Sequence, residues 1–309
     1  MAEASTFLAS KRYAVVTGAN KGIGFEICRQ LASNGVTVVL TARDEKRGLI
    51  AVEKLTRECG FSSDVLFFHK LDVMDSASVA SLADFVKTKF RKLDILVNNA
   101  GILGAMGNTD AFVRAVQLSG DWPEGEHVNW NELVTQTFET AEECLNTNYY
   151  GAKRMVEALA PLLQLSDSAR ILNISSFLGL LQHIPNERVK GVLNDVESLT
   201  EEKIDEILKK LLKDMKEGWV EEKEGGWPSY LSAYKLSKAA MNAYTRILAK
   251  KYPTFLVNCV CPGFVKTDIN CNAGPMTVHE GAQGPVKLAL LPYGGSSGLF
   301  FRKNQVSCF

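Results

Sequence analysis

The chain has 309 residues, of which 46% are hydrophobic, and its 35 basic and 35 acidic residues cancel to a net charge of zero. This composition is typical of a globular protein with a sizeable core, and the balanced charge argues against nucleic acid or an anionic membrane as a partner. We find no apolar run near the ~18 residues of a membrane span and no signal peptide. Because the seven cysteines include no C-x-x-C pair and there are four histidines, we expect free thiols, no metal site and a cytoplasmic protein.

A glycine-rich segment near the start predicts an anion site. In AVVTGANKGIGFEICRQL (14–31), a short apolar strand leads into Gly18, Gly22 and Gly24, and an amphipathic helix follows. Glycine lets the backbone approach a ligand closely, and a helix directs its free N–H groups and positive dipole end toward the preceding loop. The segment therefore predicts a phosphate-binding loop.

Apolar runs suited to buried strands alternate with helical patterns along the whole chain. The predicted strands are 13–17, 36–42, 65–72, 94–101, 170–176, 255–263 and 298–301, and 76–90 is one of the predicted helices between them. This alternation predicts an α/β, Rossmann-type, doubly wound fold, with a mostly parallel sheet of seven strands and helices on both faces. We expect a single domain spanning residues 1–309.

Two connections, 102–136 and 177–229, are too long for simple crossovers, and we interpret them as insertions. The first is polar and carries Trp122 and Trp130. The second contains LTEEKIDEILKKLLKDMKEGW, which predicts a charged helix over 200–219 with an apolar stripe. We expect this stripe to pack against the rest of the protein rather than to bind a partner.

The end of the second predicted strand indicates which dinucleotide the loop binds. Sites for NAD usually carry an acidic residue there for the ribose hydroxyls, whereas this strand ends LTARD, with Arg43 at the position suited to a 2′-phosphate. Lys21 in the glycine loop offers a second cation. These residues predict NADP(H); the alternative is that both are ordinary solvated side chains.

The chain resembles the short-chain dehydrogenase/reductase family at six motifs spread over nearly its whole length. These are TGANKGIG, NNAG (98–101), NTNYYG, ILNISS, YKLSK and CPGFVKTD. The NKGIG and TARD forms and the long insertion before the tyrosine resemble the monomeric carbonyl reductase branch, which includes plant reductases of monoterpene and alkaloid ketones.

Tyr234 and Lys238 lie four residues apart in a helical pattern, so both side chains share one face. A free phenol has a pKa near ~10, and a nearby ammonium with an oxidised nicotinamide is expected to lower the pKa of Tyr234 so that it can exchange a proton with a carbonyl oxygen. The resemblance implies that Ser176 donates a hydrogen bond to the substrate, beside Tyr234, and that Asn148 holds a water next to the lysine. Ser175 and an ordinary helix-interior amide are the respective alternatives.

The resemblance also implies the cofactor contacts. Asp72 would contact the adenine, and Pro262, Gly263, Val265 and Thr267 would flank the nicotinamide. The full set of expected NADPH-binding residues is Gly18, Asn20, Lys21, Gly22, Ile23, Gly24, Arg43, Asp72, Val73, Asn98, Ala100, Gly101, Tyr234, Lys238, Pro262, Gly263, Val265 and Thr267.

These observations favour NADPH-dependent reduction of an apolar ketone to a secondary alcohol. Menthone-like monoterpene ketones come first and alkaloid ketones or broad carbonyl reduction second. The loops expected to line the pocket are apolar: Ile102, Leu103, Phe177, Leu178, Leu180, Phe264 and Met276. A noncatalytic NADP(H)-binding regulator is the alternative from another class, although the tyrosine, lysine and serine are all present. Because the second insertion adjoins the helix through which many family members assemble, we expect a monomer in which this insertion also forms one wall of the pocket.

Overall fold

The computed structural model describes residues 11–123, 128–218, 226–302 and 304–309. Its centre is one eight-stranded sheet with the spatial order β10-β9-β8-β7-β4-β1-β2-β3. The strands of this sheet are β1 (Arg12–Val16), β2 (Val36–Ala42), β3 (Leu66–Lys70), β4 (Ile95–Asn98), β7 (Arg170–Ile174), β8 (Leu256–Cys261), β9 (Phe300–Arg302) and β10 (Gln305–Ser307).

All neighbouring strands are parallel except β9 and β10, which pair antiparallel through three residues. The seven expected strands all form, and β10 is an eighth that we did not predict. It is short and lies at the edge, so it needs none of the continuous apolar sequence that marks a buried strand.

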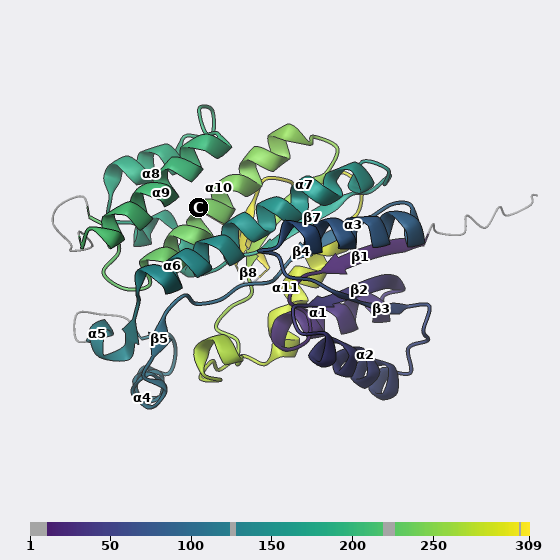
Figure 1. Ribbon diagram of the computed structural model, residues 1–309, viewed down its shortest axis with the longest axis horizontal. Coiled ribbons are helices and arrows are strands. Elements are labelled where there is room, and N and C mark those ends of the chain that lie inside the picture. Colours follow the sequence, from purple (N-terminus) through teal and green to yellow (C-terminus); the bar gives the residue numbers. More distant parts are fainter. Residues whose placement is uncertain (1–10, 124–127, 219–225, 303) are drawn as a thin grey trace, which may run out of the picture.

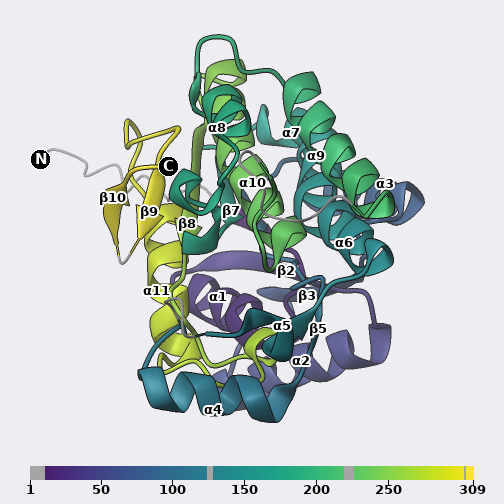
Figure 2. The same ribbon diagram turned by 90° about the vertical axis from the view of Figure 1, so that its left-hand side faces the viewer.

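Helices cover both faces of the sheet (Figures 1 and 2). The longer ones are α1 (Gly22–Ser33), α2 (Glu45–Cys59), α3 (Ser76–Phe90), α4 (Thr109–Ser119), α6 (Phe138–Leu145), α7 (Gly151–Leu163), α8 (Glu187–Asn194), α9 (Glu201–Lys216), α10 (Ser232–Lys251) and α11 (Val278–Ala289). A five-residue π-helix, Asn146–Tyr150, joins α6 to α7. Successive strand residues point to opposite faces, so Val15 belongs to one buried cluster and Val16 to the other.

The first insertion, 102–136, forms a small unit of its own beside the carboxyl ends of the strands. It contains α4, the four-residue α5 (Trp130–Leu133) and a two-stranded antiparallel sheet of β5 (Met106–Gly107) and β6 (Val134–Thr135). Figure 1 shows α4, α5 and β5 set apart from the main helical layers. Phe112, Val116 and Leu133 form its buried centre.

The second insertion places α9 against α10 and α6. The predicted stripe is buried there: Ile204, Leu208 and Leu211 are at most 1% exposed. Glu201, in the first turn of α9, pairs with Lys153 at 3.1 Å and Lys251 at 3.2 Å. The helix ends at Lys216, and Trp219, included in our predicted helix, lies outside the described residues. The insertion therefore covers one side of α10, as its apolar stripe indicated.

Within the described ranges, no helix is both long and apolar enough to span a membrane. The same part of the chain contains no group of three or more His, Cys, Asp or Glu side chains arranged to hold a metal ion. All seven cysteines are free thiols.

Candidate active site

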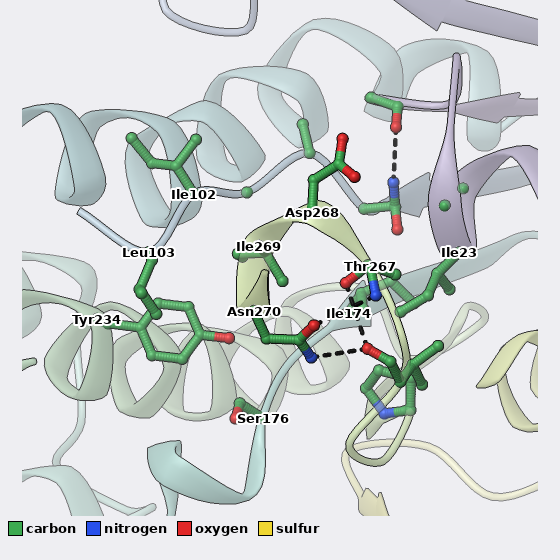
Figure 3. A pocket seen from close by; sticks show the side chains of 18 of the residues that line it. Ile23, Ile102, Leu103, Ile174, Ser176, Tyr234, Thr267, Asp268, Ile269 and Asn270 are labelled. Carbon is green, nitrogen blue, oxygen red and sulfur yellow. Dashed lines mark hydrogen bonds between the residues drawn. The ribbon is translucent and has the colours of Figure 1, made fainter. Parts of the chain in front are cut away.

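A cavity of about 920 Å³ runs along the carboxyl ends of β1, β2, β4, β7 and β8. This edge is where the loops after parallel strands converge, and the strand order changes direction between β1 and β4. One end of the cavity is lined by the glycine loop and cationic side chains, and the other by aromatic and aliphatic side chains. Figure 3 shows part of the lining, with Tyr234, Ser176 and Asn270 around the same space.

The glycine loop packs tightly against the loop that follows β4. Gly18 has φ +61°, and a Cβ there would lie 2.9 Å from Cα of Ala100. A Cβ on Gly24 would lie 2.4 Å from Nδ2 of Asn99, which donates hydrogen bonds to the carbonyls of Thr17 (2.8 Å) and Gly18 (3.0 Å). Gly18 and Gly24 are therefore needed for packing between the two loops as well as for backbone exposed to a ligand. Asn99 lines the cavity and was missing from our predicted site.

Helix α1 begins at the cavity without a side-chain cap. Its N-cap residue, Lys21, accepts no capping hydrogen bond from the described residues, and its first turn holds no acidic side chain. By contrast, α2, α3 and α4 are capped by Asp44, Asp75 and Asn108. The uncapped N–H groups of α1 lie beside the lining residues of the glycine loop, an arrangement that suits a phosphate.

Three cationic side chains line the same end of the cavity. Nζ of Lys21 lies 2.5 Å from Oδ2 of Asp268, across the cavity mouth. Arg43 is 3.8 Å from Glu143, and its side chain is 67% exposed. Arg47 is the third cation, and we did not predict it. The signal was its position four residues after Arg43, in the first turn of α2, where it faces the same region.

Most of the other predicted cofactor residues also line the cavity. Those that do are Asn20, Gly22, Ile23, Val73, Ala100, Gly101, Pro262, Gly263, Val265 and Thr267. Asp72 and Asn98 lie outside the lining. The side chain of Asp72 accepts a hydrogen bond from the backbone N–H of Met74 (2.9 Å), and Asn98 is buried, with Nδ2 donating to Oδ1 of Asn173 (2.9 Å). Asp72 thus stabilises the turn after β3, and Asn98 links the neighbouring strands β4 and β7.

Tyr234, Lys238 and Ser176 all line the cavity, the first two from α10 and the third from the end of β7. Nζ of Lys238 donates to the carbonyl of Ile174 (2.8 Å) and lies 5.7 Å from the ring centre of Tyr234. The hydroxyl of the neighbouring Ser175 donates to Oδ1 of Asn242 (2.6 Å). The hydroxyl of Ser175 is thus held by α10, whereas that of Ser176 accepts from the N–H of Leu178 (3.2 Å) and acts to lower the pKa of Tyr234.

Burial controls the ionisation of this pair. Desolvation raises the pKa of Tyr234, and the hydrogen bond from Ser176 opposes this shift only in part. Burial also lowers the pKa of Lys238, to about 8. The expected lowering of the tyrosine pKa requires an oxidised nicotinamide as well as the lysine, and it stays a prediction. Tyr234 is protonated at neutral pH and can donate its proton.

Asn148 lies in the π-helix and is fully buried. Its Oδ1 accepts from the N–H of Ile102 (2.9 Å), and its Nδ2 donates to the carbonyl of Ile102 and to Oγ of Ser237, both at 3.0 Å. Ser237 in turn donates to the backbone carbonyl of Tyr234 (2.7 Å). Asn148 thus joins the loop after β4 to the helix of Tyr234. It does not hydrogen-bond the neighbouring backbone of its own helix, which was the alternative interpretation.

The other end of the cavity is apolar and largely built by the first insertion. Phe112, Trp122, Trp130, Leu133 and Val134 line it from that segment, opposite Phe177 and Phe264. Of the apolar residues we expected, Ile102, Leu103, Phe177, Leu178 and Phe264 line the cavity. Leu180 and Met276 do not: Leu180 packs with Cys259, Cys261 and Phe300, and Met276 packs beside Gly263.

The second insertion, which we expected to form one wall of the pocket, reaches the cavity at its start and not through α9. Helix α9 contributes no residue to the lining as the structure describes it, and the second insertion reaches the cavity through Phe177 and Leu178. The reason is that the apolar stripe of α9 is already buried against α10 and α6.

The sequence was then compared with known proteins. The family model described as short chain dehydrogenase matches residues 12–189. The (+)-neomenthol dehydrogenase of Arabidopsis thaliana is 58% identical over 299 residues, covering 96% of this chain and 98% of the relative. Carbonyl reductase [NADPH] 3 of Mus musculus is 39% identical over 290 residues, covering 91% of both chains.

Among solved structures, salutaridine reductase from Papaver somniferum superimposes with a TM-score of 0.86 at 51% sequence identity. The match covers 94% of this chain and 99% of that chain. The fold and the loops that carry the site therefore lie within the matched region.

Proposed function

The chain belongs to the short-chain dehydrogenase/reductase family and is an oxidoreductase, and on this premise we propose that it uses NADPH to reduce an apolar ketone to a secondary alcohol. The observation that supports this most is the layout of one cavity. Cations and uncapped N–H groups line one end, an aromatic surface lines the other, and Tyr234, Ser176 and Lys238 lie between them.

The residues at the polar end fit a dinucleotide phosphate. Gly18 and Gly24 let the glycine loop pack closely on Ala100 and Asn99, and both line the cavity. The first turn of α1 offers N–H donors, and Arg43, Arg47 and Lys21 offer positive charge for a 2′-phosphate. The mouse relative, carbonyl reductase [NADPH] 3, supports the same cofactor by its name.

NADPH supplies the hydride in this proposal, and the protein supplies the proton. Tyr234, kept neutral by burial, donates its hydroxyl proton to the carbonyl oxygen as negative charge develops there. Ser176 donates a second hydrogen bond to that oxygen. Lys238 is placed to stabilise the tyrosinate that remains, and Asn148 holds the helix of Tyr234 in register with the loop after β4.

For the substrate, we propose a monoterpene ketone such as menthone, with an alkaloid ketone as the second choice. Support comes from the similarity to a (+)-neomenthol dehydrogenase and a salutaridine reductase, and from the apolar lining provided by Phe112, Trp122, Trp130 and Phe177. We also propose that the protein is a cytoplasmic monomer. Its seven free thiols suit a reducing compartment, and α9 covers a face of α10.

The test is a panel assay with the purified protein. Menthone, salutaridine and a small open-chain ketone are each supplied with NADPH or NADH, and loss of the reduced cofactor is followed by absorbance. We expect NADPH consumption with the apolar cyclic ketones and little with NADH, and we expect Tyr234→Phe to abolish it. Binding of NADPH without turnover of any ketone would favour the noncatalytic regulator instead.

A further inference from the structure

Four side chains from two distant parts of the chain form one continuous stack beside the apolar end of the cavity. The rings of Trp122 and Trp130 are stacked with centroids 5.3 Å apart. Trp130 stacks in turn on Tyr230, with centroids 3.8 Å apart and an interplanar angle of 1°. Nζ of Lys235 lies 3.3 Å from the ring centre of Tyr230 and is buried with its side chain. The stack therefore connects the first insertion to the start of α10.

Trp122 connects the stack to the other aromatic side chains that line the cavity. Its ring makes edge-on contacts with Phe112, Phe177 and Phe264, with centroid distances of 5.8, 5.9 and 5.5 Å. All five rings of this group, those of Trp122, Trp130, Phe112, Phe177 and Phe264, line the cavity. Each is fixed by at least one neighbouring ring, so together they form a rigid apolar surface.

The backbone is strained at Leu231, between Tyr230 and the first turn of α10. Leu231 has φ +51°, a left-handed conformation that is unfavourable for a residue with a Cβ. It is 1% exposed, and it lines the cavity. Leu231 lies between Tyr230, which is stacked on Trp130, and the first turn of the helix that carries Tyr234. Anchoring Tyr230 thus also fixes the side chain of Leu231 in the cavity.

We propose that Trp130 is a specificity-determining residue, and that Tyr230 and Lys235 are positioning residues that act through it. In this arrangement the parts of Trp130 and Trp122 that line the cavity form a fixed wall against which the ring of a cyclic ketone lies while its carbonyl reaches Tyr234 and Ser176. The inference rests on the proposed ketone reductase function and adds the part of the site that selects the substrate.

A rigid wall favours a rigid ring over a flexible chain for two reasons. A ring buries one whole side against the wall in a single conformation, and each CH₂ group removed from water is worth about 0.8 kcal/mol, which corresponds to about fourfold in affinity. An open-chain ketone of the same size also loses bond rotations when it is held against a surface that cannot adapt. Tyr230 and Lys235 contribute by preventing Trp130 from turning away.

The test compares two apolar ketones with the same number of carbon atoms, an alkyl-substituted cyclohexanone and an open-chain ketone. The ratio of their kcat/KM values is measured at saturating NADPH for the wild type and for Trp130→Leu, Trp130→Phe, Tyr230→Leu and Lys235→Met. The matched control is Leu118→Ala, on the same insertion, where the side chain is 90% exposed. The Kd of NADPH and the thermal unfolding of each variant are measured alongside.

We expect Trp130→Leu to lower the cyclic-to-open-chain ratio about three- to tenfold, mainly through a higher KM for the cyclic ketone, and Trp130→Phe to retain most of the ratio. Tyr230→Leu and Lys235→Met should change the ratio in the same direction, with the Kd of NADPH and the pH profile unchanged. Leu118→Ala should leave all values unchanged. An unchanged ratio in Trp130→Leu overturns the inference.

A binding measurement separates this inference from the proposed function. The two ketones are titrated by calorimetry into the enzyme saturated with NADP⁺, so no turnover is needed. If the wild type reduces neither ketone yet binds the cyclic one more tightly, and Trp130→Leu loses that preference, the reductase proposal fails and the role of the wall stands. If both ketones are reduced but the Trp130 variants change neither the binding preference nor the ratio of kcat/KM values, the wall proposal alone fails.

Discussion

Replacing Arg43 with alanine should weaken NADPH far more than NADH, because these cofactors differ by the 2′-phosphate. A hydrogen bond to a charged group is worth about 1.5–3 kcal/mol, and the lower part of that range applies because the Arg43 side chain is 67% exposed and already near Glu143 at 3.8 Å. A loss of about 1–2 kcal/mol corresponds to about 5- to 30-fold in the KM and Kd of NADPH. Arg47 and Lys21 remain in place, so binding is weakened rather than abolished.

The assay measures kcat and KM for NADPH and for NADH with one ketone, together with the Kd of each cofactor by fluorescence titration. Arg57→Ala is the matched control, since Arg57 lies in the last turn of α2, away from the cavity, and should change neither cofactor. Glu143→Gln removes the carboxylate near Arg43 and should tighten NADPH about two- to threefold at low salt. Equal losses for NADPH and NADH in Arg43→Ala would refute the assignment of Arg43 to the 2′-phosphate.

Three further predictions address the catalytic residues and the assembly. Tyr234→Phe should lower kcat about 10²- to 10⁴-fold with the Kd of NADPH nearly unchanged, because the proton donor is lost while the ring still packs; near-normal turnover would contradict the role of Tyr234. Burial lowers the pKa of Lys238 in the folded protein to about 8, from its ordinary value of 10.5. Between these values the unfolded chain binds more protons than the folded one, so this side chain makes stability rise with pH in that window. From pH 8 to 10 the free energy of unfolding of the wild type, relative to Lys238→Met, should therefore increase by about 2 kcal/mol in denaturant titrations, and the comparison cancels other titrating groups; a flat difference would show that the pKa of Lys238 is not lowered. Light scattering after size-exclusion chromatography at micromolar concentration should give a mass near the 33.9 kDa of one chain, and a stable tetramer would contradict the monomer.

The sheet could be predicted because its signals are local and strong. β1, β2, β4, β7 and β8 are continuous apolar runs, and such runs between helical patterns have few other stable arrangements. β10 could not be predicted in the same way: its three residues gain their pairing from β9, a tertiary effect that no periodicity records.

The polar part of the site was more predictable than the apolar part. Residues such as Gly18, Tyr234 and Lys238 lie in motifs whose spacing reflects one loop or one helix face. The aromatic wall depends instead on how Trp122 and Trp130 pack against Phe177 and Phe264 from other segments, and the surrounding sequence reads as polar. Long-range packing of this kind decides which side of an insertion faces the cavity.

The position of α9 followed from its sequence more directly. Its amphipathic pattern indicated one buried face, and the neighbouring helix α10 was the expected surface for it. The stripe of Ile204, Leu208 and Leu211 is buried there, and Glu201 adds ion pairs with Lys153 and Lys251.

The uncapped start of α1 has a consequence for how long the polypeptide survives in a cell. A ligand that binds the folded chain through these N–H groups, and not the unfolded chain, adds RT ln(1 + [L]/Kd) to stability, about 2.7 kcal/mol when the ligand is at 100 times its Kd. The unfolded fraction available to proteases then falls about 100-fold. Under this linkage a scarce dinucleotide raises the fraction of the protein that is open to proteases, and a plentiful one protects it.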